Sequence, residues 1–431
     1  MTHRSVEVPV VARVEGEGAL HVRVDDGEIT RLELEIYEPP RFFESFLRGR
    51  HFSEVPDIVA RICGICPVAY QMSAVHGLER LFEAEVPEGT RELRRLLYCA
   101  EWIESHMLHV HLLALPDFLG FDDAIALARG GFKEAVERGL RIKRLGNDLL
   151  AAVGGREVNP VSPVVGGFSK AVSARELRAF LPRIEDALGE ILQVADLVAP
   201  LEMPVLPRDA ELVAMTNPLE FPMNEGDLAS TRGRLFTAAE FEEVSTELHV
   251  PHSNALHSVF ADTGLPYVVG PLSRVVLNEA ALTPLAREAA TRAGLHLPTL
   301  DPFASMAARV AETALALEEA LRLIEAYEPP SPPRVAIVPR AGRATWTTEA
   351  PRGTIYHRYD VADDGTITEA KIVPPTSQNL RHMERDLREF LPGVLDRPDE
   401  ELTRLAEMVV RNYDPCISCA THFLRMDVER A

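Results

Sequence analysis

The sequence predicts an α+β fold in which a long central helical bundle is flanked by small β-sheets from the two ends of the chain. Apolar and polar residues alternate near the N-terminus, which is typical of strands. Apolar residues then recur three and four positions apart, as in helices, and alternate again near the C-terminus. We expect one domain over residues 1–431, with N-terminal strands in 1–53, a helical core in 54–327, and C-terminal strands and short helices in 328–431.

Two similar turns mark the predicted sheets. Asp-Asp-Gly occurs at 25–27 and again at 363–365, and each is followed by a strand-like run that ends in Pro-Pro, at 39–40 and 374–375. Asp-Gly between such runs is a strong signal for a β-hairpin. The repetition predicts two hairpins that lie near each other and each deliver a loop to one site. Common turn chemistry used twice explains the pattern equally well.

Long stretches of Leu, Ala, Glu and Arg predict helices through the middle of the chain. Residues 202–300 contain more Pro, Asn and Thr, so we expect mixed loops and short helices there. Proline-rich residues 328–333 end the helical part. The expected helices are 54–82, 90–130, 131–153, 173–198 and 303–327, with two shorter ones at about 378–394 and 399–412.

The composition excludes several classes of protein. A formal net charge of −21 argues against a nucleic-acid binder, which would carry a basic surface. No run approaches about 18 consecutive apolar residues, so no direct membrane insertion is expected. The first residues lack the apolar core of a secretory signal, and the cysteines do not indicate a disulfide framework, because such frameworks belong to small secreted domains. We therefore expect a cytoplasmic protein that uses cysteine for metal or redox chemistry.

Four of the cysteines form two Cys-x-x-Cys pairs at opposite ends of the chain, Cys63 with Cys66 and Cys416 with Cys419. Four thiolates around one ion suit zinc, nickel, copper(I) or iron–sulfur chemistry. Structural zinc is the plainer alternative, but zinc-binding pairs usually lie within tens of residues of each other, and these are hundreds apart. The pairs predict a metal site between the two terminal parts of the fold.

The residues around these pairs resemble the signature sequences of nickel–iron hydrogenase large subunits. Six motifs follow the family's order from residue 13 to residue 422, so the resemblance covers nearly the whole chain. They are Arg-Val-Glu-Gly at 13–16, Glu-Pro-Pro-Arg-Phe-Phe-Glu at 38–44, Arg-x-Cys-Gly-x-Cys at 61–66, Ala-Pro-Arg-Gly at 350–353, Pro-Pro-Thr-Ser-Gln-Asn at 374–379 and Asp-Pro-Cys-x-x-Cys-x-x-His at 414–422.

The resemblance implies a Ni–Fe centre at which H2 is split heterolytically, with a nearby base taking the proton. It implies that Cys63 and Cys416 are terminal ligands of nickel. Cys66 and Cys419 would bridge the nickel to an iron that carries CO and cyanide.

The same resemblance gives roles to four further residues. Glu15 would carry the proton, because a carboxylate enclosed by apolar residues can exchange protons near neutral pH; the alternative is a solvated strand glutamate. Arg352 would place a guanidinium beside the open metal position. The alternative interpretation is that Arg352 forms a surface salt bridge. Pro375 and Thr376 would surround the CO and cyanide ligands.

A magnesium site is implied near the C-terminus, with Glu44 and His422 as ligands. Oxygen donors suit Mg²⁺, although histidine is an unusual ligand for so hard a cation. Without the resemblance, Glu44 has the features of a plain surface residue. In much of this family a maturation protease removes the residues after the last histidine once nickel-insertion factors have loaded the site, so we expect cleavage near His422.

Other candidates have simpler explanations. His106, His109 and His111 share one predicted helix, and a packed or solvated helix accounts for them better than a metal pair. Cys99 is expected to be an inert buried cysteine. Asp117 is a candidate ion-pair partner of Arg352.

Two positions depart from the family's common pattern. Tyr70 and Glu17 both stand where many members have histidine. Tyrosine can donate a hydrogen bond to a thiolate but cannot relay protons near neutral pH. Residues 39–50 and 67–73 look most like the cytosolic NAD(P)-linked hydrogenases of the sulfhydrogenase alpha group.

The resemblance also implies partners. No cysteines remain for an iron–sulfur relay, so an iron–sulfur small subunit must carry the electrons. Flavin and iron–sulfur diaphorase subunits would connect it to NAD(P), with sulfur or polysulfide as a further acceptor. Within the family, an F420-reducing or energy-converting hydrogenase is the alternative. Outside it, the alternatives are a structural zinc protein and an inactive relative of the respiratory NADH dehydrogenase subunit, which lacks the four cysteines.

Overall fold

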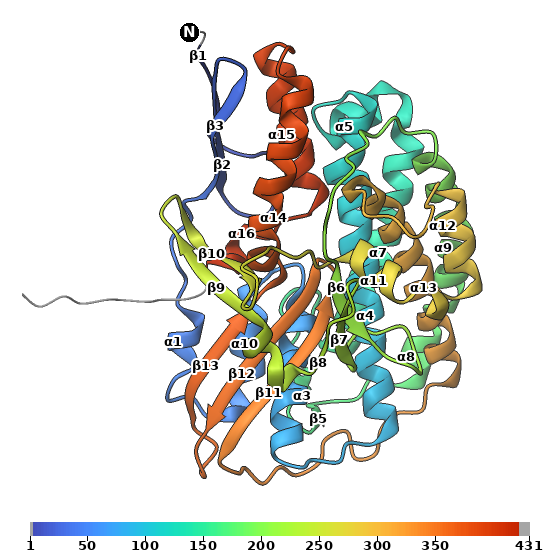
Figure 1. Ribbon diagram of the computed structural model, residues 1–431. Helices are drawn as coiled ribbons and strands as arrows, with labels where there is room; N and C mark the ends of the chain where they lie inside the picture. The colour runs from blue at the N-terminus through green and yellow to red at the C-terminus, as the bar shows by residue number, and fades with distance from the viewer. Residues whose placement is uncertain (1–2, 422–431) are drawn as a thin grey trace, which may run out of the picture.

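The computed structural model describes residues 3–421 and has the predicted combination of a helical bundle and small antiparallel sheets (Figure 1). The first hairpin turn has the predicted Asp-Asp-Gly sequence, and the φ angles of Asp26 and Gly27 are 51° and 86°. Positive φ at both central residues matches the twist of the flanking strands. The N-terminal sheet consists of β1 (His3–Val8), β2 (Gly18–Asp25) and β3 (Glu28–Ile36), in that order.

The second predicted hairpin belongs to a separate sheet near the C-terminus. Its turn lies against the segment that follows the N-terminal sheet, because Phe52 N–H donates to Gly365 O and Ile367 N–H donates to Arg50 O, both over 2.8 Å. The two ends of the chain therefore meet here. The strands of this sheet are β11 (Gly342–Ala350), β12 (Gly353–Val361) and β13 (Ile367–Val373).

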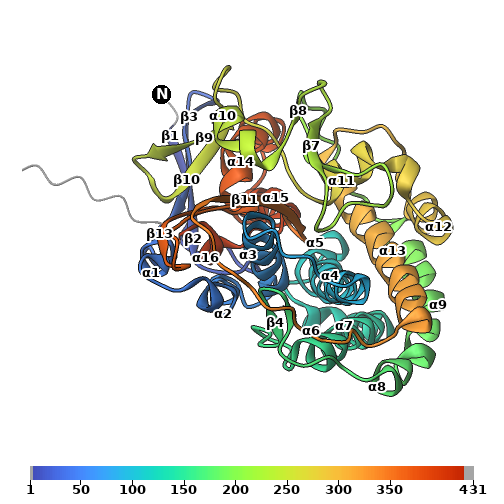
Figure 2. The same ribbon diagram turned by 90° about the horizontal axis from the view of Figure 1, so that it is seen from below.

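Long helices form the central bundle, which Figure 2 shows from below. Residues 305–317 are buried on every face of their helix, where alanine recurs. A helix that is buried all round belongs inside a core, and here Arg309 and Glu312 are buried with the apolar residues. The long helices are α3 (Pro67–Leu81), α4 (Glu88–Leu108), α7 (Lys133–Gly154), α9 (Leu181–Val198) and α13 (Ser305–Ala326).

Two of the predicted helices are interrupted. The range 90–130 is divided because Pro116 lacks a backbone donor and Gly120 ends a helix with a φ of 75°. The range 54–82 is divided by the first cysteine pair. The shorter segments that result are α2 (Val55–Val59), α5 (Leu115–Leu119) and α6 (Ala124–Leu127), with a π-helical turn at His109–Ala114.

Residues 202–300 differ most from the prediction, because they contain strands as well as loops and short helices. These strands have two to eight residues, too few for a clear alternation in most of them. They are β6 (Val213–Thr216), β7 (Asp227–Ser230), β8 (Leu235–Phe236), β9 (Ser245–Val250) and β10 (Ser253–Phe260), among α10 (Phe241–Val244), α11 (Pro271–Leu277) and α12 (Pro284–Arg292). The remaining small elements are α1 (Phe43–Leu47), α8 (Ala174–Arg178), β4 (Pro163–Val164) and β5 (Gly167–Phe168).

The C-terminal helices lie between the N-terminal sheet and the bundle (Figure 1). The two predicted short helices are present, and the first begins at Pro375, which favours a first helical turn. They are α14 (Pro375–Phe390) and α15 (Asp399–Asn412), followed by α16 (Ile417–Ala420). No helix within residues 3–421 is both long enough and apolar enough to cross a membrane.

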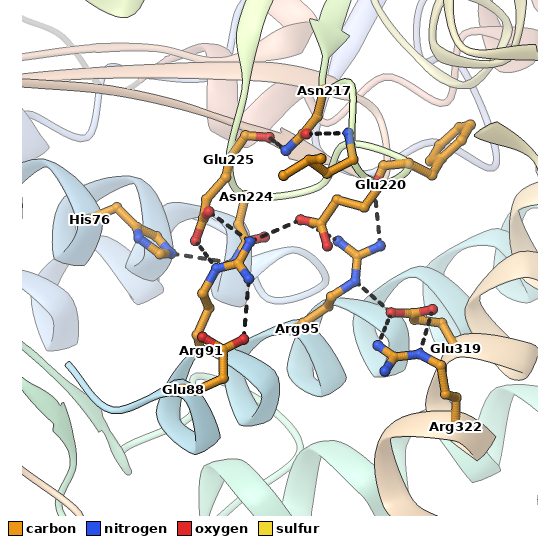
Figure 3. A network of polar contacts seen from close by, with 12 residues as sticks. His76, Glu88, Arg91, Arg95, Asn217, Glu220, Asn224, Glu225, Glu319 and Arg322 are labelled. Atoms are coloured by element: carbon orange, nitrogen blue, oxygen red, sulfur yellow. Dashed lines mark hydrogen bonds and ion pairs between the residues drawn. The ribbon is translucent and has the colours of Figure 1, made fainter. Parts of the chain in front are cut away.

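An ion-pair network holds the loop 217–225 against the bundle (Figure 3). Arg91 of α4 donates from Nε and Nη2 to the two carboxylate oxygens of Glu225, both over 2.8 Å. One turn further along α4, Arg95 Nε donates over 2.8 Å to Glu319 Oε1 of α13. Helix α4 thereby joins the loop to α13 through charged groups.

Candidate metal centre

The two cysteine pairs meet in the interior, as the sequence predicts. All four side chains are buried, and their sulfur atoms lie within 4.8 Å of one another. The Cys63 sulfur is 2.6 Å from that of Cys66 and 3.6 Å from that of Cys416. The sulfurs of Cys416 and Cys419 are also in direct contact with each other.

The two sulfurs of the first pair differ in acidity. Burial disfavours a thiolate at Cys63, but a hydrogen bond from Cys66 and the charge of Arg352 outweigh it and lower the pKa of the Cys63 thiol. The backbone N–H of Cys66 also donates to the Cys63 sulfur, over 3.0 Å. Burial raises the pKa of the Cys66 thiol, and the neighbouring Cys63 raises it further. Cys63 is therefore the first of the two to lose its proton.

Glu101, which the sequence did not single out, fixes the helix that follows the first pair. Its carboxylate accepts hydrogen bonds from the N–H groups of Val68, over 2.6 Å, and Ala69, over 3.2 Å. These amides lie at the start of α3, where backbone donors have no partner inside the helix. Glu101 is fully buried, and burial raises its pKa. The contact orients α3 directly after Cys66.

Glu15 lies at the second cysteine pair. Its Oε2 is 3.0 Å from the Cys416 sulfur and accepts a hydrogen bond from Ser418 N–H over 3.1 Å. The backbones also pair, since Ile417 N–H donates to Glu15 O over 2.8 Å. Glu15 is half-buried, so one side of the carboxylate faces the sulfur and the group still reaches toward solvent.

Gly16 explains why the two segments can approach so closely. Its φ is +86°, and a Cβ at this position would lie 2.7 Å from Glu38 Oε2 and 2.8 Å from Ser418 N. Such distances are shorter than any side chain tolerates, so only glycine fits between the N-terminal segment and the second pair.

Arg352 reaches the cysteines from the turn between β11 and β12. Its Nη1 lies 3.9 Å from the Cys66 sulfur, while Nε and Nη2 donate to the backbone and carboxylate oxygens of Asp414 over 2.7 and 3.1 Å. Burial opposes its charge, but Asp414 and the two nearby sulfurs raise its pKa. The guanidinium is thus permanently charged beside the sulfur cluster.

The expected pairing of Asp117 with Arg352 is wrong. Asp117 accepts hydrogen bonds from Arg411 Nε and Nη2, over 2.7 and 2.8 Å, and contacts Arg13. Asp414, two residues before Cys416, takes the place beside Arg352. The sequence placed Asp117 after Pro116 but gave no sign of which of several arginines it faces.

A buried ion cluster that the sequence did not reveal holds the Arg352 loop in place. Arg274 of α11 donates over 2.7 Å to each carboxylate oxygen of Glu312 and over 3.0 Å to Glu349. It also donates to the carbonyls of Ala350 and Pro351 over 2.8 and 2.9 Å. These contacts fix the backbone immediately before Arg352. An arginine inside the apolar run of residues 271–277 is the only local signal for this role.

Two polar side chains contact the cysteine segments, and one of them, Arg41, joins the two. Arg41 Nη2 donates to Ile62 O over 2.6 Å and also contacts Ser418 O. Thr376 Oγ1 accepts a hydrogen bond from Cys416 N–H over 2.9 Å, and the neighbouring Pro375 is buried at the start of α14. Both predicted residues of α14 are therefore next to the second pair.

Glu44 lies in α1, against β13. Its Oε1 accepts a hydrogen bond from Ile372 N–H over 2.8 Å, and burial raises its pKa to about 7. It is therefore not a plain surface residue. His422, the other predicted magnesium ligand, lies outside the described residues.

The candidate histidines and Cys99 are packed in the interior. The histidines of α4 and the turn after it are buried: His106 Nε2 is 3.0 Å from Glu312 Oε2, and His109 Nε2 bonds to Arg411 O over 2.8 Å. Cys99 and His111 are also buried, which confirms the prediction of a packed helix. Tyr70 is buried with its ring 5.7 Å from that of His357, and its hydroxyl has no hydrogen-bond partner among the described residues. Glu17 is exposed.

Comparison with known proteins agrees with this geometry. Residues 41–135 match the family described as nickel-dependent hydrogenase. The chain is 31% identical over 425 residues to sulfhydrogenase 1 subunit alpha of Pyrococcus furiosus, with 98% of each chain covered. It is 32% identical over 425 residues to sulfhydrogenase 2 subunit alpha of that organism, covering 98% of this chain and 100% of the relative. A crystal structure of an NAD+-reducing NiFe-hydrogenase in the H2-reduced state matches with a TM-score of 0.86 at 27% identity, covering 97% of this chain and 99% of that one.

With this identity over nearly its full length, the chain belongs to the nickel-dependent hydrogenases, as a large, catalytic subunit and thus an oxidoreductase that acts on H2. The donor set fits the Ni–Fe centre of that family. Four buried sulfurs from two distant segments lie together, and thiolates are suitable ligands for both metals.

Proposed function

We propose that this chain couples the reversible heterolytic cleavage of H2 to NAD(P), with sulfur or polysulfide as a further electron acceptor. The observation that carries the proposal is the convergence of four cysteine sulfurs, Glu15 and Arg352 at one buried point. Similarity to an NAD+-reducing enzyme over 97% of the chain supports the nucleotide as acceptor. Similarity to two sulfhydrogenase alpha subunits supports sulfur or polysulfide as the further electron acceptor.

In this proposal Cys63 and Cys416 would hold the nickel, and Cys66 and Cys419 would be ligands shared by nickel and iron. When bound, the Ni–Fe centre supplies the heterolytic cleavage of H2. The protein's part is to hold the four sulfurs together. The lowered pKa of the Cys63 thiol and the fixed charge of Arg352 favour a thiolate at Cys63.

Glu15 moves the proton. Its carboxylate lies 3.0 Å from the Cys416 sulfur, within the distance over which a general base takes a proton directly. Ser418 N–H holds the same oxygen in place. Since Glu15 is half-buried, it can pass the proton outward after receiving it.

Arg352 positions charge beside the sulfurs, and the first residues of α14 lie beside Cys416. The Arg352 guanidinium is held on two sides by Asp414, which leaves Nη1 directed at Cys66. The Thr376 oxygen already accepts from Cys416 N–H, so its hydroxyl proton can be donated to a cyanide ligand. In this proposal Pro375 and Thr376 would line the space for the CO and cyanide ligands, and Glu44 with His422 would hold Mg²⁺.

Electrons leave through a partner iron–sulfur subunit. The only other cysteine in the sequence is Cys99, which is buried in α4. Arg61 and Gly64 are exposed while the cysteines beside them are buried, so a partner surface can lie close over the first pair. Diaphorase subunits with flavin would carry the electrons on to NAD(P). Nickel-insertion factors and a maturation protease would act before the complex is active.

Metal analysis combined with infrared spectroscopy of the purified complex tests the proposal. We expect nickel and iron in equal amounts, together with CO and cyanide bands. Cys416→Ser should lose nickel and H2 oxidation, whereas the matched variant Cys99→Ser should keep both. Zinc alone in the wild-type protein would overturn the proposal. Reduction of a deazaflavin such as F420 in place of NAD(P) would overturn only the assignment of NAD(P) as the electron acceptor.

A further inference from the structure

Two histidines and a glutamate meet where the β9–β10 hairpin lies on α14, away from the cysteines. His252 lies in the hairpin turn, His257 in β10 and Glu384 in α14. One possible ligand atom from each lies within 4.8 Å of the others. Within residues 3–421, these three and the four cysteines are the groups of metal-binding side chains that converge in this way. We call the three residues the hairpin cluster.

The hairpin itself brings the two histidines together. Residues five apart in a regular strand point to opposite faces, but the pairing of β10 with β9 is irregular between Ser253 and His257. The rings of His252 and His257 consequently lie 5.7 Å apart, centroid to centroid. This arrangement is what two imidazoles need in order to reach one ion.

Glu384 is held in place to complete the set. Its Oε1 lies 2.7 Å from His252 Nε2 and accepts a hydrogen bond from Leu34 N–H over 3.1 Å. Its Oε2 faces the guanidinium of Arg381, which is half exposed, at 3.8 Å. The carboxylate is therefore oriented by β3 of the N-terminal sheet as well as by its own helix.

His257 carries the argument, because it is fully buried and neither ring nitrogen has a hydrogen-bond partner among the described residues. Buried polar groups are almost always paired, so such a ring requires an explanation. A metal ion provides one, since it binds the nitrogen lone pair.

We propose that the hairpin cluster binds one divalent transition-metal ion, with zinc as the best chemical match. Two imidazoles and one carboxylate supply three corners of the tetrahedral arrangement that zinc prefers. Water can fill the fourth, because the His252 side chain is 17% exposed. Magnesium and calcium are poor matches, since they prefer oxygen ligands.

The role of this ion is to fasten three separate parts of the chain. The ligands join the β9–β10 hairpin to α14, and Glu384 extends the connection to β3 through Leu34. The same helix carries Thr376 at its other end, beside Cys416. The ion therefore stabilises the support of the Ni–Fe site and takes no part in H2 chemistry, so this inference does not depend on the proposed function.

The test is metal analysis of the purified complex after incubation with one equivalent of zinc per chain and removal of loosely bound ions. We expect one zinc per chain in addition to nickel and iron, and an anomalous-scattering peak at the zinc edge between His252, His257 and Glu384. His257→Ala and Glu384→Gln should each lose the zinc, keep their nickel, and lower the thermal midpoint of the complex. Glutamine retains an oxygen for Leu34 N–H, so Glu384→Gln should fold even where His257→Ala does not.

His21→Ala is the matched control, because His21 lies 2.7 Å from Glu35 in a similar pair that has no second histidine. It should keep the zinc. Absence of stoichiometric zinc from the wild-type complex would overturn the proposal. A zinc peak elsewhere would do the same, as would zinc that survives Glu384→Gln.

Discussion

Replacing Arg274 with methionine should destabilise the chain and displace Arg352, although Arg274 touches neither a cysteine nor Arg352. Arg274 donates hydrogen bonds to both oxygens of Glu312, to one of Glu349, and to two carbonyls of the loop that leads to Arg352. All three charged side chains are 0% exposed. Methionine fills a similar volume but leaves two buried carboxylates without their cation.

The size of the effect follows from this burial. Removing one partner of a buried ion pair costs about 3–5 kcal/mol, because the remaining charge is uncompensated. The unfolding entropy of globular proteins, roughly 2.1 cal/mol/K per residue, amounts to about 0.9 kcal/mol/K for a chain of 431 residues. The thermal midpoint should therefore fall by about 3–6 °C.

Calorimetry of the purified complex, with H2 oxidation measured on the same samples, is the appropriate assay. Arg287→Met is the matched control, because Arg287 is exposed and donates only to the carbonyls of Leu282 and Ala280; its effect should stay within about 0.5 kcal/mol. A midpoint for Arg274→Met equal to that of the control would refute the role given to the buried cluster. Normal H2 oxidation in Arg274→Met would show that Arg352 is positioned without it.

Other consequences can be tested singly. Glu15→Gln should keep nickel and iron but slow H/D exchange by about 10²–10⁴-fold, whereas the exposed Glu17→Gln should not, as gas-phase mass spectrometry would reveal. Burial raises the pKa of Glu104 to about 7 from an ordinary value of 4.5, so stability should fall by about 3 kcal/mol as pH rises through that window. Glu104→Gln should remove this dependence in unfolding measured between pH 5 and 8. Arg91→Ala breaks a partly exposed pair with Glu225 and should cost only about 1 kcal/mol, with a smaller loss in high salt.

The sequence predicted those parts of the site whose residues belong to short local motifs. Each cysteine pair is a local motif, and Glu15 and Thr376 each lie in a recognisable run of a few residues. Their convergence could be inferred because both pairs need the same metal. The structure brings Glu15 and Thr376 to Cys416, as that inference requires.

The parts that were not predicted depend on which distant residues face each other. Arg274, Glu312 and Glu349 lie on α11, α13 and β11, and nothing in their local sequences pairs them. The prediction that Asp117 pairs with Arg352 was wrong for the same reason, because several arginines could have paired with it. The short strands of residues 202–300 were missed for a different reason: each is stabilised by its neighbours in the sheet more than by its own pattern.

The structure also explains one wrong boundary in physical terms. A helix over 90–130 was predicted from composition, but Pro116 and Gly120 divide it. In the segment 109–119, before the break at Gly120, His109 bonds to Arg411 O and Asp117 pairs with the side chain of Arg411. The interruption thus ties the bundle to the helix that precedes the second cysteine pair.

Polar contacts from outside the bundle hold the second cysteine pair, among them those of Glu15, Glu38, Arg41 and Thr376. Residues 416–421 form a short segment after α15, so they could detach from these contacts while the long helices of the bundle stay packed against one another. The rest of the protein can therefore fold first, with Cys63 and Cys66 already in place. Docking of residues 416–421, which carry Cys416 and Cys419, onto the delivered metal can then be the last step of assembly.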